Sequence, residues 1–211
     1  MKKKLLSILL TFCMVLTLLP TAAFAEDGTS AAATEVQTET DLRKAVNNSS
    51  VSVVKLTADI NISTSLTITR AVTLDLNDHV LNMTGNDSVI KVEGGGNLTL
   101  TDSAETKSKK KFAKNENSLW VLDENGDQSV TGGVITGGTG FHRGNYAYGG
   151  VYVAQNGTFT MNGGNIVGCT AFNDQHSMGG GVYVAPNGTF TMTGGSEIAP
   201  ITQDYGTAIT A

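Results

Sequence analysis

The chain has 211 residues, a formal net charge of −5 at pH 7 and only two cysteines, Cys13 and Cys169. An acidic chain repels phosphate groups, so this composition argues against nucleic acid as a partner. Two cysteines allow at most one disulfide, and Cys13 lies in the N-terminal segment described next. The folded part is therefore expected to be held together by burial and backbone pairing alone.

Residues 1–25 have the three parts of a secretory signal peptide. Lysines at positions 2 to 4 precede an apolar run from Leu5 to Leu19, and Ala23-Phe24-Ala25 is a small-x-small cleavage pattern. The run is shorter than the roughly 20 apolar residues of a membrane-spanning helix. We therefore predict cleavage near Ala25, which removes three lysines and changes the net charge from −5 to −8. The mature chain is expected to be secreted or at the cell surface, with no membrane span.

The segment before the first strands divides into a leader and a short helix. Residues 26–38 are small and polar, as is typical of a flexible leader. In "ETDLRKAV", which follows, three apolar residues share one helical face: Leu42, Ala45 and Val46. Thr40 or Asp41 is placed to cap this helix. Residues 39–118 are thus predicted to hold a short N-terminal capping helix and the first coils.

From Val51 onward apolar residues alternate with polar ones, which is the pattern of short strands divided by Asn, Asp, Gly or Thr turns. The predicted strands are Val53–Leu56, Leu66–Ile68, Val72–Leu76, Val80–Met83, Val89–Val92 and Leu98–Leu100. The next segment, Ala104–Leu119, carries a cluster of lysines: Lys107, Lys109, Lys110, Lys111 and Lys114. We interpret it as a solvated inserted loop, with a contact for an anionic polymer as the alternative.

A long internal repeat follows. Residues 149–164, "GGVYVAQNGTFTMNGG", return as "GGVYVAPNGTFTMTGG" at 180–195, which is 31 positions later. Asn125-Gly126 and Gly132-Gly133 lie one period earlier than their counterparts. A fixed period of this size is typical of stacked structural repeats, although Asn-Gly also favours consecutive hairpins. We predict three 31-residue coils over residues 119–211, the last degenerate and without an evident C-terminal cap.

If each unit is one coil, residues one period apart stack about 4.8 Å apart, and alternate residues point inward. The inward columns are then Trp120, Val151 and Val182; Leu122, Val153 and Val184; Phe159 and Phe190; and Val130, Met161 and Met192. Val121, Tyr152 and Tyr183 form an outward column. The two tyrosines are candidate glycan contacts, and a column that only stiffens the surface is the alternative. Outward Thr-x-Thr pairs resemble an ice-binding array, which Asp127 and Ser129 would interrupt.

The motifs "VTLDLNDHVLNM" at 72–83, "GGGNLTLTDS" at 94–103 and the "GGVYV" and "NGTFTM" units resemble a known family. They are similar to secreted, right-handed parallel β-helix proteins of the pectin-lyase-like superfamily, in particular long surface proteins of Gram-positive bacteria. The resemblance implies an all-β, right-handed parallel β-helix, or solenoid, with a short N-terminal capping helix. It also leads us to expect that the chain is the first part of a longer surface protein.

Enzymes of that superfamily need several carboxylates together on the outer face. Asp123, Glu124 and Asp127 are replaced one period later, so acids are not expected to stack across coils. We therefore assign no catalytic residue, metal ligand or cofactor. The leading hypothesis is a non-catalytic adhesin or scaffold that contacts polysaccharide or a host surface protein. The alternatives are a polysaccharide lyase or glycoside hydrolase whose site lies in coils beyond residue 211 or in the 104–119 loop, and a structural spacer that carries a distal domain.

Overall fold

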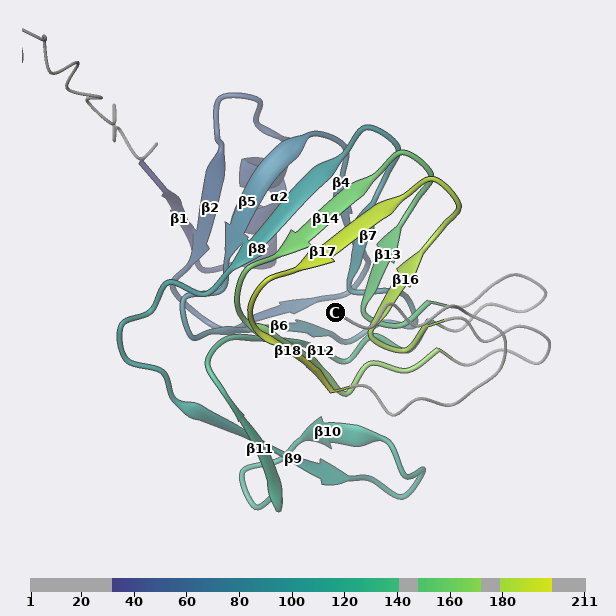
Figure 1. The fold of residues 1–211 in the computed structure, drawn as a ribbon. Coiled ribbons are helices and arrows are strands. Elements are labelled where there is room, and N and C mark those ends of the chain that lie inside the picture. Colours follow the sequence, from purple (N-terminus) through teal and green to yellow (C-terminus); the bar gives the residue numbers. More distant parts are fainter. Residues whose placement is uncertain (1–31, 141–147, 172–178, 199–211) are drawn as a thin grey trace, which may run out of the picture. The chain divides into compact units, whose positions relative to one another are not determined.

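The computed structural model describes residues 32–140, 148–171 and 179–198, so the predicted signal peptide lies outside the described residues. Within these ranges, fifteen strands form three parallel sheets, which the chain visits in the repeated order sheet 1, sheet 2, sheet 3 (Figure 1). Sheet 1 contains β1 (Thr34–Val36), β2 (Val53–Leu56), β5 (Ala71–Asp75), β8 (Asn97–Thr101), β14 (Thr158–Met161) and β17 (Thr189–Met192). Sheet 2 contains β3 (Ile60–Ile62), β6 (Val80–Met83), β12 (Val134–Thr136), β15 (Asn165–Val167) and β18 (Ser196–Ile198). Sheet 3 contains β4 (Leu66–Ile68), β7 (Ile90–Val92), β13 (Val151–Val153) and β16 (Val182–Val184).

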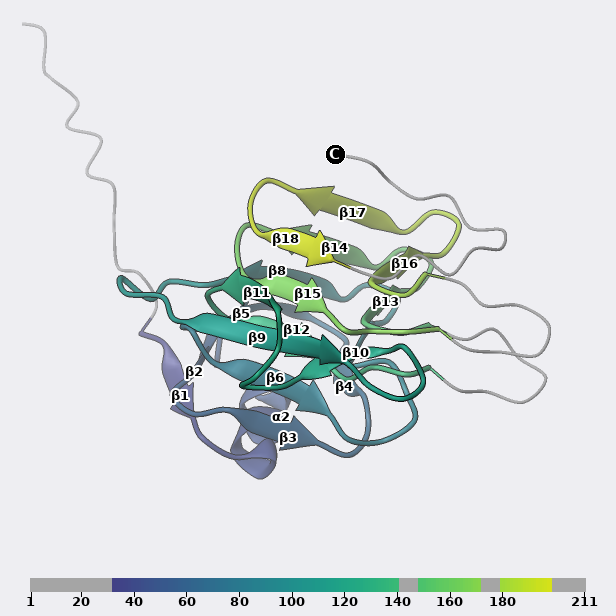
Figure 2. The same ribbon diagram turned by 90° about the horizontal axis from the view of Figure 1, so that it is seen from below.

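The strand register confirms the 31-residue period for the last two coils, where a coil is one passage through the three sheets. Val151 lies beside Val182, and Phe159 lies beside Phe190, with ring centroids 5.1 Å apart. The repeated sequence therefore produces stacks of identical side chains, and each strand finds its hydrogen-bond partner one period away. Figure 2 shows the coils lying one above another.

Earlier coils have other lengths, which is why the sequence does not reveal them as repeats. Val54 lies beside Leu74, 20 positions later, and Val72 lies beside Leu98, 26 positions later. The strands still register, because each coil varies only in the connections between sheets. Sheet pairing therefore depends on alternating apolar residues, and a constant period is not required.

The predicted first unit is wrong over residues 119–131. These residues belong to an antiparallel sheet, here called the side sheet, made of β9 (Lys109–Lys114), β10 (Trp120–Leu122) and β11 (Gln128–Thr131). Trp120 lies opposite Lys114, whereas Val151 has Ile90 as its partner in the preceding coil. The side sheet occupies a 32-residue connection between β8 and β12, where β14 and β15 are joined by three residues.

Phe112 anchors the side sheet to the outer face of sheet 2. Val130, predicted to stack with Met161, instead lies opposite Lys110 in the side sheet and faces the same cluster as Phe112. The members of this cluster are Val80, Phe112, Val130, Val134 and Val167, with Trp120 packed against them. Sheet 2 is consequently covered on both faces, which explains why all three residues of β12 and of β15 are buried.

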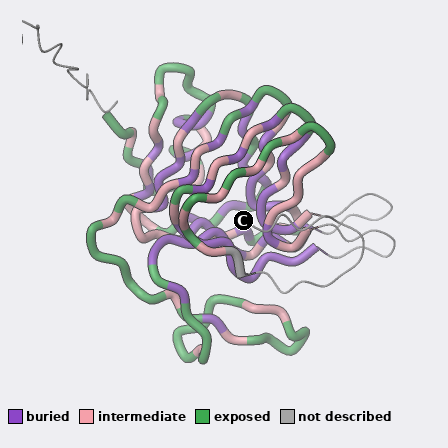
Figure 3. Tube along the Cα trace, in the orientation of Figure 1, coloured by how far each residue is buried: buried purple, intermediate pink, exposed green. Residues whose placement is uncertain are grey.

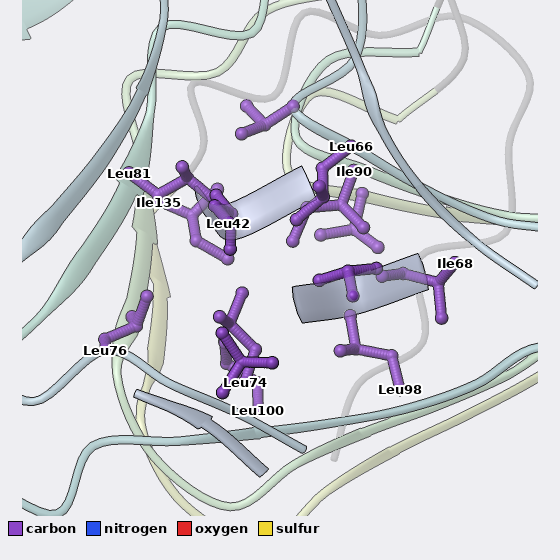
Figure 4. Close-up of a cluster of buried hydrophobic side chains, with 14 of the residues drawn as sticks. Leu42, Leu66, Ile68, Leu74, Leu76, Leu81, Ile90, Leu98, Leu100 and Ile135 are labelled. Atoms are coloured by element: carbon purple, nitrogen blue, oxygen red, sulfur yellow. The ribbon is translucent and has the colours of Figure 1, made fainter. Parts of the chain in front are cut away.

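The main core lies between the three parallel sheets. Figure 3 shows buried residues along the inner side of the coils, and Figure 4 shows side chains from all three sheets meeting there. The labelled residues are Leu42, Leu66, Ile68, Leu74, Leu76, Leu81, Ile90, Leu98, Leu100 and Ile135, none more than 1% exposed. Burial of this uninterrupted apolar column is the main force that holds the stack together.

The helix α2 (Glu39–Asn47) buries Leu42, as the periodicity predicts, but its cap differs from the prediction. Thr38 is the N-cap residue, and its hydroxyl accepts the N–H of Asp41 at 3.2 Å. Thr40 and Asp41 instead lie in the first turn, since Thr38 is the residue with extended backbone. The range predicted as a flexible leader is also partly ordered: β1 pairs with β2 and buries Val36.

Arg70 ties the C-terminal turn of α2 to sheet 1. Its guanidinium donates to the carbonyl oxygens of Val46 at 2.8 Å and Ala45 at 3.0 Å, which lie in the last turn of the helix. Replacing Arg70 with alanine is expected to lower the free energy of unfolding by about 1.5–3 kcal/mol, because charged hydrogen bonds are lost. Lys44→Ala is the control, since Lys44 is an exposed cation in the same turn. Urea unfolding of both variants checks this, and equal effects would contradict it.

Candidate functional site

Three tyrosine rings gather on the outer face of sheet 3. Tyr152 and Tyr183 lie side by side in β13 and β16, with ring centroids 5.9 Å apart and an interplanar angle of 10°. Tyr148 joins them, with centroid distances of 4.4 Å to Tyr152 and 4.5 Å to Tyr183. All three side chains are partly exposed. We call these residues the tyrosine cluster.

Strand alternation places two members of the cluster outward, as the sequence predicts. Val151 and Val153 of β13 are buried in the core, so Tyr152 between them faces solvent. Tyr148 precedes the strand, and its carbonyl oxygen accepts the Ser88 hydroxyl at 2.7 Å. Sequence reasoning missed Tyr148 because it lies outside the alternating segment and its counterpart one period later is glycine.

The tyrosine cluster lies near three charged residues, Glu93, Lys91 and Asp87, and the last two are paired with each other. Burial, then the negative charge of Glu93 and the neighbouring Tyr183, raise the pKa of Tyr152, so its hydroxyl stays protonated. The preceding residue in the column, Lys91, forms an ion pair with Asp87 at 2.8 Å. Although burial alone raises the pKa of Asp87, hydrogen bonds from Lys91 and Ser88 hold it below its ordinary value. The cluster therefore presents aromatic surface and hydroxyl groups to a ligand.

The predicted lysine loop is partly strand β9, and its lysines divide into two groups. Lys107 pairs with the buried Asp102 at 3.0 Å, and Lys110 pairs with Asp78 at 3.4 Å. Burial alone raises the pKa of Asp78, but hydrogen bonds from Ser108 and the charge of Lys110 hold it below its ordinary value. These lysines fasten the side sheet to the corner between sheets 1 and 2. The remaining members of the group are exposed: Lys109, Lys111 and Lys114.

Two acids have structural partners: Asp123, from the set considered for catalysis, and Asp102, which directly follows β8. Asp123 accepts the backbone N–H of Asn125 at 2.8 Å, within the turn between β10 and β11. Asp102 accepts the backbone N–H groups of Asp78 at 2.7 Å and Gly133 at 3.0 Å. Among the described residues, no group of three or more His, Cys, Asp or Glu side chains is arranged to hold a metal ion.

The threonine array requires a correction. Asp127 and Ser129 do not interrupt it, because β8 rather than β11 lies beside β14. One outward column is continuous over four strands: Thr73, Thr99, Thr160 and Thr191. The adjacent column begins with Ala71 and Asn97 and has threonine only in β14 and β17, whereas the Thr-x-Thr pair of β8 lies on the other side, at Thr99 and Thr101.

Parallel strands stacked in three sheets, with one short helix, are consistent with the β-helix type of fold. Residues 33–191 match the family described as "Putative pectate lyase-like adhesive domain". The chain belongs to this family, and the match includes the side sheet and most of the tyrosine-bearing coils. No curated protein and no solved structure matches the chain. Within the described ranges, the structure has no helix of the length and apolarity that a membrane crossing requires.

Proposed function

We propose that this chain is a non-catalytic adhesive domain that contacts glycans or host surface proteins through the tyrosine cluster. The observation that carries the proposal is the convergence of Tyr148, Tyr152 and Tyr183 on one outer face. Membership of an adhesive-domain family supports it. Tyrosine combines an apolar ring with a hydrogen-bonding hydroxyl, which suits both sugars and protein surfaces.

The parallel ladder favours such a contact because it fixes the rings before a ligand arrives. Val151 and Val153 are buried on one side of β13, and β7 and β16 hold it on both edges. A side chain on a rigid strand loses less conformational entropy on binding than one on a free loop. Two neighbouring strands that each present a tyrosine therefore form a preorganised contact surface.

The remaining parts of the proposal concern the handedness of the β-helix, its N-terminal cap and the export of the chain. We take the chain to be a right-handed β-helix in which α2 caps the first coil, and its family and its buried helix face support this. The signal-peptide pattern ending near Ala25 supports secretion or display at the cell surface. Cell fractionation and N-terminal sequencing of the exported chain test this part.

Replacing Tyr152 and Tyr183 together with alanine is expected to weaken binding by at least about tenfold, since central aromatic anchors carry much of the binding energy at interfaces. Glycan arrays and cell-adhesion assays with the full chain provide the measurement. The control is Thr160→Ala, an outward residue of similar setting on sheet 1. Unchanged adhesion of the double variant would contradict the role of the tyrosine cluster. Release of unsaturated or reducing sugars from polysaccharides would instead support an enzyme.

A further inference from the structure

A pocket of about 370 Å³ lies where the side sheet meets sheet 2, and none of the residues that line it belongs to the tyrosine cluster. Residues 119–122, which comprise β10 and the residue before it, form one wall. Side chains of consecutive residues in an extended segment point to opposite faces of the sheet. Because all four residues line the pocket, the backbone edge of the strand faces it. β10 is one of the two outer strands of the side sheet, and its free edge offers backbone donors and acceptors to a ligand.

The opposite wall is rich in uncharged polar groups. Five of these polar side chains come from the three-sheet stack, and a sixth, Asn115, comes from the connection between β9 and β10. The five are Asn82, Thr84, Asn86, Thr139 and Thr170. The Thr84 hydroxyl donates to the carbonyl oxygen of Ile62 at 3.1 Å, which leaves its lone pairs as acceptors. The Asn115 carboxamide oxygen accepts the N–H of Leu119 at 3.0 Å, which orients its NH2 group as a donor.

Trp120 gives the pocket an aromatic surface. Its ring is partly buried against the cluster around Phe112, and the Lys114 Nζ lies 5.3 Å from the ring centroid. These contacts hold the indole in place. Gly168 allows the backbone of β10 to lie close to the end of β15, because a Cβ at position 168 would meet the Trp120 carbonyl oxygen at 2.5 Å. A rigid indole beside amides and hydroxyls suits a ligand with one apolar face and a rim of hydroxyl groups.

We propose that this pocket binds an uncharged sugar residue of a glycan. None of the residues that line it is charged, and the Lys114 ammonium beside it already lies over the Trp120 ring, so a charged ligand would lose hydration there without gaining an ionic partner in the lining. The volume falls in the lower part of the range of small-ligand pockets, about 300–1,000 Å³. This site is separate from the tyrosine cluster, and it needs the side sheet, which no other connection in the described coils supplies.

Trp120 is the only tryptophan of the chain, so intrinsic tryptophan fluorescence reports on this pocket directly. Neutral oligosaccharides from xylan, mannan, galactan and glucan are titrated into the full chain, with oligogalacturonides as the acidic set. We expect a saturable change in Trp120 emission with at least one neutral oligosaccharide. No saturable change with any of them, or a change with the acidic set alone, would overturn the proposal.

Two variants separate ligand contact from folding. Asn86→Ala removes an exposed amide, and is expected to weaken the fluorescence-detected binding about 3- to 10-fold, as the loss of one hydrogen bond implies. Tyr152→Ala is the matched control and should leave this binding unchanged, even if it abolishes adhesion through the tyrosine cluster. An Asn86→Ala variant that binds like the unmodified chain would show that the sugar lies elsewhere.

Discussion

Replacing Phe112 with alanine is expected to release the side sheet from sheet 2 while the three parallel sheets stay folded. Phe112 is only 1% exposed and is the one aromatic ring fully buried between the side sheet and sheet 2 in the described residues. Truncating a buried phenylalanine costs about 3–5 kcal/mol, and the Lys107–Asp102 and Lys110–Asp78 ion pairs cannot fill the cavity that it leaves. Hydrogen exchange of residues 109–131 should then accelerate, and Trp120 emission should shift to longer wavelength.

Lys111→Ala is the control for this experiment, because Lys111 lies in the same strand but is exposed. Its exchange pattern should match that of the unmodified chain. If Phe112→Ala instead unfolded the whole protein in one transition, the side sheet would be an integral part of the core. If it left exchange in residues 109–131 unchanged, the lysine ion pairs would be the main attachment.

The second large effect is expected from Phe159→Ala. This ring is completely buried in the core and stacks on Phe190 of the next coil. Its loss should lower the free energy of unfolding by about 3–5 kcal/mol, through lost burial and the cavity left between coils. The change is measured by urea unfolding followed by far-ultraviolet circular dichroism.

Phe190→Ala is the comparison, since the same residue type occupies the same column one coil later but is only partly buried. A smaller loss of stability is expected there, because less area is removed from water in the folded state. Equal losses for the two variants would show that the last coil is covered as fully as the one before it. A larger loss for Phe190→Ala would contradict the burial order.

Sequence periodicity predicts the coils well where apolar and polar residues alternate. Val151 and Tyr152 face opposite sides as expected, and Leu42 marks the buried helix face. The side sheet was missed because its insertion separates Leu98 from Phe159 by 61 positions, close to two periods. Asn125-Gly126 therefore lies 31 positions before Asn156-Gly157 only because of the length of the insertion, and not because it occupies the same place in a coil.

Backbone conformation distinguishes the two kinds of Asn-Gly turn. Asn156 and Asn187 have φ values of 61° and 64°, whereas Asn125 is not among the residues with positive φ. A sequence pattern cannot separate these cases, since Asn-Gly suits several turn types. For the candidate sites, alternation gave Tyr152 and Tyr183. Tyr148 and the pocket depend on how non-repeating connections fold back, which no periodic pattern encodes.

The side sheet lies in the connection from β8 to β12, at a corner where the other coils turn in three or four residues. The ladder on either side is undisturbed, since β8 pairs with β14 and β6 pairs with β12 as though the detour were absent. A long inserted segment at this corner therefore does not change the pairing of the parallel strands. A change in the length or sequence of this one connection therefore alters the outer surface of the protein and leaves the pairing of the parallel strands as it is.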